Sequence, residues 1–215
     1  MSDDDHIKAL KEALVREKER GDEMRIRTIE LLDFTDKSNE AKMARWNALG
    51  ALEGDVPSMH DIGKHYDEGY GVPESKELAF YWYKCAAEAG DGYAMNDVAI
   101  MYSKGIGTMF DGETAIAWYK KAVAVGVPEA KGNLGYCYLC GKCMPRDPLL
   151  AVKMFEDLIT NDTSRASGRN YYNLAMCYER GDGVAVDFDK ACELYRKAQE
   201  LGCDDATAAL ERLEE

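Results

Sequence analysis

The residues Asp61-Ile62-Gly63-Lys64-His65-Tyr66-Asp67-Glu68-Gly69-Tyr70-Gly71-Val72 form a pattern that returns along the chain. Its first tyrosine reappears at intervals of 36, 36 and 40 residues, as Tyr102, Tyr138 and Tyr178. A glycine follows each tyrosine three residues later, at Gly69, Gly105, Gly141 and Gly181. A fixed period of about 20 to 50 residues is the signature of a solenoid, in which no unit is large enough to bury its own apolar face. The 215 residues are therefore predicted to form a stack of similar units.

Further positions recur in register, and we call each such set a column. One column is always apolar and the next is always small: Ile62, Val98, Leu134, Leu174 and Leu210, then Gly63, Ala99, Gly135 and Ala175. An aromatic or apolar pair follows later in each unit, as Trp82–Tyr83, Trp118–Tyr119, Met154–Phe155 and Leu194–Tyr195. Small residues let two helices cross closely, and the pair is predicted to fill the gap to the next unit.

The columns also predict secondary structure. Ser58, Ile62, His65 and Tyr66 share one helical face, and glycine at 69 and 71 can end that helix in a left-handed conformation. Residue types that cap helix N-termini then begin a second helix in each unit, at Ser75, Asp111, Asp147 and Asp187. Each unit is therefore predicted to be a helix A, a glycine turn and a helix B.

This pattern resembles a known family. Leu-Gly-x-x-Tyr-x-x-Gly-x-Gly-Val, then Asp, Ala and Trp-Tyr-x-Lys-Ala-Ala, is similar to the Sel-1-like repeat (SLR), a relative of the tetratricopeptide repeat. Here it reads as residues 61–72 and then as residues 81–90, and the resemblance covers residues 39–215. It implies an all-α protein, an α/α right-handed superhelix of about four Sel-1-like repeats with N-terminal helices and a C-terminal capping helix. It also implies a scaffold for protein complexes.

The sequence predicts a domain organisation with atypical ends, because a solenoid must cover its terminal apolar surfaces. We expect an N-terminal helical cap at 1–38, a repeat solenoid at 39–203 and a capping helix at 204–215 that buries Ala206 and Leu210. The units are predicted at about 55–90, 91–126, 127–166 and 167–202. Before them, Asn39 is the expected N-cap of a lone helix B at 40–53, and 22–32 is a degenerate helix A. The third unit carries Cys143 in place of a turn glycine, and a polar insertion within 161–170 predicts a lengthened turn.

Residues 3–20 allow two interpretations. Ile7, Leu10 and Leu14 make a short apolar stripe among many charged residues. The stripe can cap the first unit, or it can form a homo-oligomer or bind a partner. The cap is favoured, because the stripe is too short for a coiled coil and a cap is needed there.

The composition argues against several partner classes. Lys and Arg number 27 and Asp and Glu number 40, which gives a formal net charge of -13. Such a chain repels nucleic acid and anionic membranes, and its charge is expected either to maintain solubility or to attract a basic peptide or protein. The sequence has no run of about 20 apolar residues, and its start lacks the basic and apolar regions of a signal peptide. The expected location is therefore cytoplasmic.

Seven cysteines need an explanation. Disulfide-stapled relatives pair a cysteine at the end of helix B with one eight residues later, and from Cys85 that position is Tyr93, so the pattern is absent. Reduced structural thiols are the expectation. Cys137, Cys140 and Cys143 form the alternative, a thiol- or zinc-dependent switch or hydrolase, although the second pair of ligands that a zinc site usually shows is missing.

No enzyme motif stands out in the sequence. There is no Gly-x-Ser-x-Gly or Walker motif, and His60 and His65 are five residues apart, which is off the spacing for two ligands on one helix face. The Gly-x-Gly pairs recur with the repeat between two helices, so they are turns. The sequence predicts a non-enzymatic adaptor that needs no cofactor and no metal.

Helix A of such repeats is expected to line the concave surface, as in tetratricopeptide repeats. Its exposed face carries a polar column at Asp61, Asp97, Asn133 and Asn173, which can bond the backbone of an extended peptide. The predicted binding surface adds the residues around that column: Lys64, Tyr93, Asn96, Ile100, Tyr136, Tyr172 and Met176. Aromatic rings beside polar groups are typical of interface hot spots. Alternatively, the column bonds neighbouring turns or helices of the chain itself.

Overall fold

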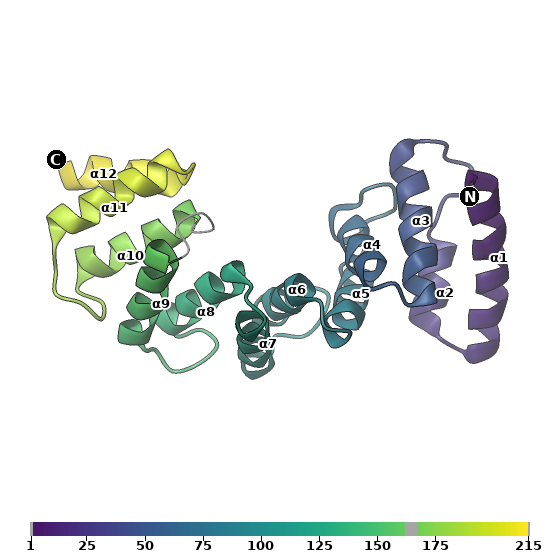
Figure 1. Ribbon diagram of the computed structural model, residues 1–215, viewed down its shortest axis with the longest axis horizontal. Coiled ribbons are helices and arrows are strands. Elements are labelled where there is room, and N and C mark those ends of the chain that lie inside the picture. The colour runs from purple at the N-terminus through teal and green to yellow at the C-terminus, as the bar shows by residue number, and fades with distance from the viewer. Residues whose placement is uncertain (1, 162–166, 215) are drawn as a thin grey trace. The chain divides into compact units, whose positions relative to one another are not determined.

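A computed structural model describes residues 2–161 and 167–214. Most of the predicted insertion in the third unit falls at 162–166, outside the described residues. The described part is all helical and contains no strand (Figure 1). Its helices are α1 Asp3–Arg20, α2 Glu23–Glu30, α3 Asn39–Glu53, α4 Val56–Glu68, α5 Lys76–Glu88, α6 Gly92–Lys104, α7 Gly112–Ala124, α8 Pro128–Cys140, α9 Pro148–Asn161, α10 Gly168–Arg180, α11 Phe188–Glu200 and α12 Asp204–Glu214. The predicted all-α solenoid is confirmed.

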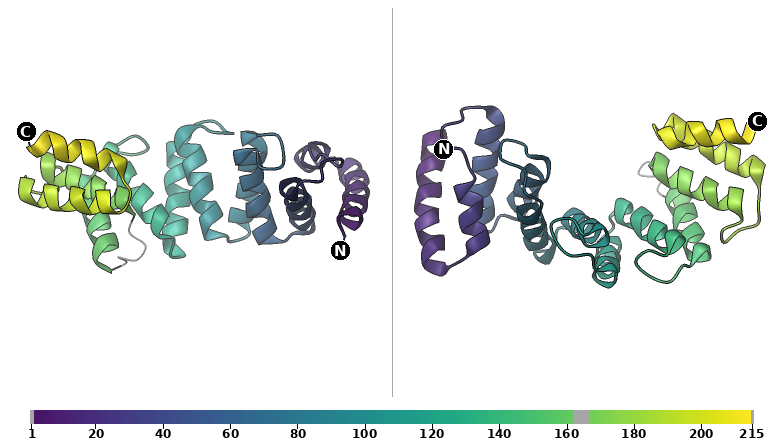
Figure 2. Two further views of the ribbon diagram at one scale, coloured as in Figure 1. Left: turned by 90° about the horizontal axis from the view of Figure 1, so that it is seen from above. Right: turned by 180° about the vertical axis from the view of Figure 1, so that it is seen from behind.

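The helices form two compact units, which are larger than the repeat units. The first is Met1–Asp111 with α1–α6, and the second is Gly112–Glu215 with α7–α12. In the first unit, α1 packs against α2 and α3, and α3 to α6 pack each on the next (Figure 1). In the second unit, each helix from α7 to α12 packs on its successor, and both views of Figure 2 keep α10, α11 and α12 together. No helix in the described ranges is long and apolar enough to cross a lipid bilayer.

The glycine turn between helices A and B repeats the same hydrogen bonds. Gly69 is left-handed, with φ 69°, and its N–H donates to the carbonyl of His65; Gly105, Gly141 and Gly181 do the same to Met101, Cys137 and Cys177. The N–H of Ser75 then donates to the carbonyl of Tyr66 at 2.8 Å. The equivalent bonds join Asp111 to Tyr102, Asp147 to Tyr138 and Asp187 to Tyr178. This bond closes the loop and accounts for the constant spacing between the tyrosine column and the cap column.

The cap column behaves as predicted at three positions. The side chains of Ser75, Asp147 and Asp187 accept hydrogen bonds from the N–H of Leu78, Leu150 and Lys190. The prediction for Asn39 is wrong by one residue. Ser38 is the N-cap of α3, and its hydroxyl accepts from Ala41, because a cap side chain must bond an N–H three residues further on.

The small column is needed where helices A and B of one unit cross. A Cβ on Gly63 would lie 2.6 Å from Cδ1 of Tyr83, and one on Gly135 would lie 3.0 Å from Cε1 of Phe155. Tyr83 and Phe155, the second residues of their aromatic or apolar pairs, therefore pack inside their own repeat units. Trp82, the first residue of its pair, packs on the preceding helix A rather than toward the next repeat unit, since its indole Nε1 donates to Oγ1 of Thr28 on α2 at 2.8 Å.

We expect Gly135→Leu to lower the free energy of unfolding by about 1–3 kcal/mol, because the added side chain must displace the buried ring of Phe155. Urea denaturation followed by circular dichroism measures the change. Lys120→Leu, at an exposed position of α7, is the control and should change it by less than about 0.5 kcal/mol. An equally small effect at both positions would mean that the crossing can open without cost.

The N-terminal helices bury a different stripe from the predicted one. The buried face of α1 is His6, Leu10, Ala13 and Glu17, while Ile7 and Leu14 lie at its half-buried margins. Polar contacts set this rotation. Arg45 of α3 is fully buried, and its guanidinium donates to the carboxylate of Asp3 at 2.9 Å and to the carbonyl of Asp33 at 2.6 Å. These bonds hold the start of α1 on α3, and the buried face of α1 that contains Leu10 packs against other helices of the same chain.

Candidate functional site

The exposed face of the first helices carries the predicted binding residues in each unit. In the first unit, Asp61 and Lys64 are exposed on α4, and their side chains lie 3.7 Å apart. Tyr93, Asp97 and Ile100 follow at i, i+4 and i+7 on α6, so they share one helical face. Tyr93 is 56% exposed, and the other two are half-buried.

A histidine links these two helices beneath that face. Nε2 of His60 on α4 lies 2.9 Å from Oδ2 of Asp97 on α6, and Nδ1 lies 3.9 Å from Oδ1 of Asp91. The imidazole also packs beside the ring of Tyr83, with centroids 5.5 Å apart. One oxygen of Asp97 is therefore already bonded within the chain, as the alternative interpretation of the polar column requires.

The second unit presents the same face on α8 and α10. Tyr136 is 50% exposed on α8, one helical turn after the half-buried Asn133. Tyr172 and Met176 are half-buried on α10, and the guanidinium of Arg169 lies 5.6 Å from the centre of the Tyr172 ring. Each of the two compact units thus has one strongly exposed tyrosine on a helix A: Tyr93 on α6, next to the carboxylate of Asp97, and Tyr136 on α8, next to the amide of Asn133.

Two predicted contact residues are buried. Asn96 is 7% exposed and Asn173 is 3% exposed, so neither offers its amide to a partner in this state. Asn173 lies between the two residues that tie α10 to the capping helix α12, since Arg169 bonds Asp205 and Glu179 bonds Arg212, both at 2.6 Å. Periodicity places a residue on a face, but it does not say which neighbouring helix covers that face.

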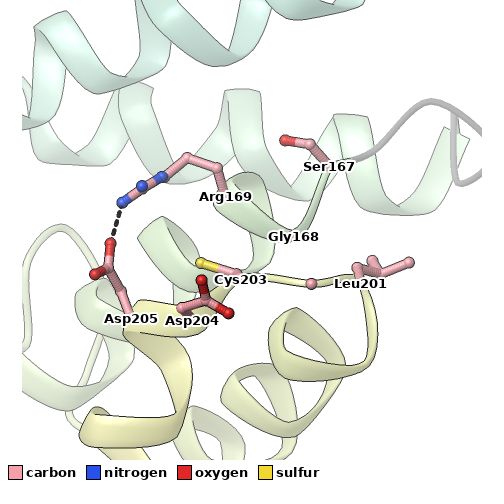
Figure 3. Close-up of a pocket in the computed structure, with 8 residues that line it drawn as sticks. Ser167, Gly168, Arg169, Leu201, Cys203, Asp204 and Asp205 are labelled. Carbon is pink, nitrogen blue, oxygen red and sulfur yellow. Dashed lines mark hydrogen bonds and ion pairs between the residues drawn. The ribbon is translucent and has the colours of Figure 1, made fainter.

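Sequence reasoning did not find a polar hollow where the start of α10 meets the turn between α11 and α12. It has a volume of about 370 Å³ and is lined by Ser167, Gly168, Arg169, Leu201, Gly202, Cys203, Asp204 and Asp205. Figure 3 shows the ion pair of Arg169 with Asp205 on one side of the hollow, and Cys203 next to Asp204. The sequence signal at this place is Gly202, which follows α11 as Gly54, Gly90 and Gly126 follow α3, α5 and α7.

A second hollow, of about 410 Å³, lies between α1 and α3. Asp3, His6, Lys42, Met43, Trp46 and Asn47 line it, and the rings of His6 and Trp46 are 5.0 Å apart. Trp46 is 60% exposed, although it occupies the column in which Trp82 is fully buried. The reason is that the first helix B has no complete unit before it to pack against.

The cysteines are all free thiols. Burial raises the pKa of Cys137 and of Cys177 to about 12. Among the described residues, no group of three or more His, Cys, Asp or Glu side chains is placed to hold a metal ion. The three cysteines at 137, 140 and 143 differ in exposure: the first is buried, the second exposed and the third half-buried.

Comparison with protein families agrees with this architecture. The Sel1 repeat matches residues 56–91, 92–127, 128–156 and 171–203, which together make up more than half of the chain. The chain belongs to the Sel1 repeat family. Proteins built from Sel1 repeats mediate protein–protein interactions and are typically non-catalytic scaffolds.

Solved structures of Sel1 repeat proteins resemble this one. A Sel1 repeat protein from Oxalobacter formigenes is 26% identical with a TM-score of 0.73, over 81% of this chain and 68% of that one. A protective antigen of uropathogenic Escherichia coli strains, which displays an SLR fold, is 24% identical with a TM-score of 0.68. That match covers 92% of this chain and 42% of the antigen, so this chain spans less than half of its length. The comparison with curated proteins gives no match.

Proposed function

We propose that this Sel1 repeat protein is a non-enzymatic adaptor that binds a protein or peptide on its helix A face. We define the helix A face separately for each compact unit: Asp61, Lys64, Tyr93, Asp97 and Ile100 in the first, and Asn133, Tyr136, Tyr172 and Met176 in the second. The observation that carries the proposal is the exposure of Tyr93 and Tyr136, about half of each side chain, on helices whose other aromatic residues are more deeply placed. Exposed tyrosines beside polar groups are the usual anchors of a binding interface.

The polar groups of the face favour an extended segment as the ligand. Asp61 and Asp97 lie one repeat apart on α4 and α6, which the His60–Asp97 bond holds together. Acceptor groups repeated along a scaffold can each bond an N–H donor of an extended backbone. The tyrosine rings then contact the apolar parts of its side chains.

The charge favours a basic partner. The chain has a formal net charge of -13, and Asp61 and Asp97 contribute two of its carboxylates to the face. Complementary charge mainly raises the association rate and falls in effect as salt is added. Capture that weakens between low and physiological ionic strength supports this part of the proposal.

We expect the double substitution Tyr93→Ala and Tyr136→Ala to abolish capture of a partner from native cell extract while leaving the melting temperature nearly unchanged. The rings are exposed, so removing them costs little packing inside the chain. Quantitative mass spectrometry of proteins retained by the immobilised full chain measures the loss.

Tyr70→Ala is the matched control, since Tyr70 is 46% exposed but lies in the turn after α4 rather than on the helix A face. A partner retained by the Tyr70 variant and lost by the double variant places binding on the helix A face. Equal retention by wild type and both variants would contradict the proposal and move the binding surface elsewhere.

A further inference from the structure

One turn between helices A and B carries a cysteine where the other three carry glycine. Gly71, Gly107 and Gly183 are left-handed, and each sits on the first turn of a helix B. A Cβ on any of the three would overlap backbone atoms there, those of Glu40, Lys76 and Pro148 respectively. No side chain fits at this position in those turns. At the equivalent position in the third turn, the chain nevertheless has Cys143.

The residue opposite Cys143 has changed in the reverse direction. Gly112, the first residue of α7, stands in the column of Glu40, Lys76 and Pro148. A Cβ on Gly112 would lie 2.9 Å from Cα of Cys143 and 3.0 Å from its carbonyl oxygen. Among the described non-glycine residues none has a positive φ, so Cys143 is unstrained. In this contact the turn has a side chain, Cys143, and the helix has the glycine, Gly112, whereas the other three contacts have the glycine in the turn. The missing side chain at residue 112 makes room for the thiol of Cys143.

The neighbour of that thiol is a second thiol. Cys137 lies in the column of His65 and Met101, whose side chains pack on the turn that follows their own helix. In the second turn, for example, a Cβ on Gly107 would lie 3.1 Å from Cε of Met101. In the third turn the same two positions are both cysteine, and Cys143 is among the groups that raise the pKa of Cys137, so the two thiols are neighbours. Cys140 is exposed, and its thiol donates instead to the carbonyl of Cys137.

We propose that Cys137 and Cys143 are a redox-active pair that forms a reversible intrachain disulfide, with a peroxide as the oxidant. The thiolate of the half-buried Cys143 attacks one peroxide oxygen, which gives a sulfenic acid and releases hydroxide. The sulfur of Cys137 then attacks the sulfenic sulfur, and the S–O bond breaks as the S–S bond forms. The proton of Cys137 and one from solvent convert the two oxygens to water. Two thiols are thus oxidised and one hydrogen peroxide is reduced, and a dithiol reductant reverses the change.

The order of the two steps follows from exposure and burial. Burial raises the pKa of Cys137, so this thiol is almost wholly protonated at neutral pH and is a poor first nucleophile. Cys143 is more accessible, and Cys137 is held beside it to resolve the sulfenic acid. The bond would tie the last turn of α8 to the loop that rests on the start of α7.

The test is peptide mapping of the full chain after hydrogen peroxide treatment, acid quenching and alkylation of the remaining thiols. Trypsin cleaves after Lys131, Lys142 and Arg146, so Cys137 and Cys143 fall in separate peptides, 132–142 and 143–146. We expect these two peptides to be joined after oxidation and separate after reduction. The link should persist in Cys140→Ser, which removes the third thiol of the segment.

Cys143→Gly restores the residue of the other turns, so this variant should fold, as circular dichroism will show, and the link should be absent. A bond within peptide 132–142 would assign the redox pair to Cys137 and Cys140 and overturn the proposal. A link that disappears in Cys140→Ser, full alkylation of all three thiols after peroxide, or irreversible oxidation of Cys143 alone would each overturn it too.

Discussion

Trp82→Ala is expected to lower the free energy of unfolding by about 3–5 kcal/mol, whereas Trp46→Ala should lower it by less than about 0.5 kcal/mol. The two residues occupy the same column one repeat apart. Trp82 is 0% exposed, and its indole N–H donates to the hydroxyl of Thr28 in the preceding helix A. Its removal leaves a large cavity and an unpaired acceptor. Trp46 is mainly in solvent, so its removal leaves neither.

Urea denaturation of each variant, followed by circular dichroism, measures both changes. Trp82→Phe is the second variant, because it keeps most of the ring volume and loses the hydrogen bond to Thr28. It should fall between wild type and Trp82→Ala. Repeat units can unfold separately, so coincidence of the fluorescence and circular dichroism transitions must be checked before free energies are compared. Equal losses of unfolding free energy for Trp46→Ala and Trp82→Ala would mean that packing against the preceding repeat unit does not account for the contribution of Trp82 to stability.

This pair of tryptophans shows how far the sequence predicts the fold. Within the stack, a column has the same neighbours in every unit, so its residue type reports its surroundings. The tyrosine, glycine and cap columns therefore predicted the helices and turns from α4 to α11. At the N-terminus the neighbours differ, and the same residue type has another environment. The buried face of α1 was accordingly missed, because Arg45 and Glu17, two charged residues, help to set it.

The candidate site was less predictable than the fold for a related reason. Tyr93 and Tyr136 lie on the helix A face as expected, yet Asn96 and Asn173 of the same prediction are buried. The burial of a side chain depends on how neighbouring helices pack, and the pattern of a single helix contains no information about that packing. The sequence shows Cys143 as a departure from the turn glycine, but it does not show the matching change at Gly112, since the two residues are 31 positions apart.

Gly107→Ala is expected to lower the free energy of unfolding by about 2–5 kcal/mol. Two effects add. A φ of +64° costs an alanine about 1–2 kcal/mol, and the new Cβ would overlap the carbonyl of Lys76 at the start of α5, which costs about 1–3 kcal/mol more. The obstacle is helix backbone, so it cannot turn aside as a flexible side chain would. Thermal and urea denaturation of the variant measure the loss.

Gly90→Ala separates the two effects, because Gly90 also has a positive φ, +104°, but nothing lies within 4 Å of its missing Cβ. It should lose only the conformational part, about 1–2 kcal/mol. A larger loss at Gly107 than at Gly90 would show that the turn is pressed against the helix beside it. Such tight contact is the reason that a cysteine at the third turn requires glycine at residue 112. Equal losses at the two positions would mean that the turn can move away, and Cys143 would then need no compensating glycine.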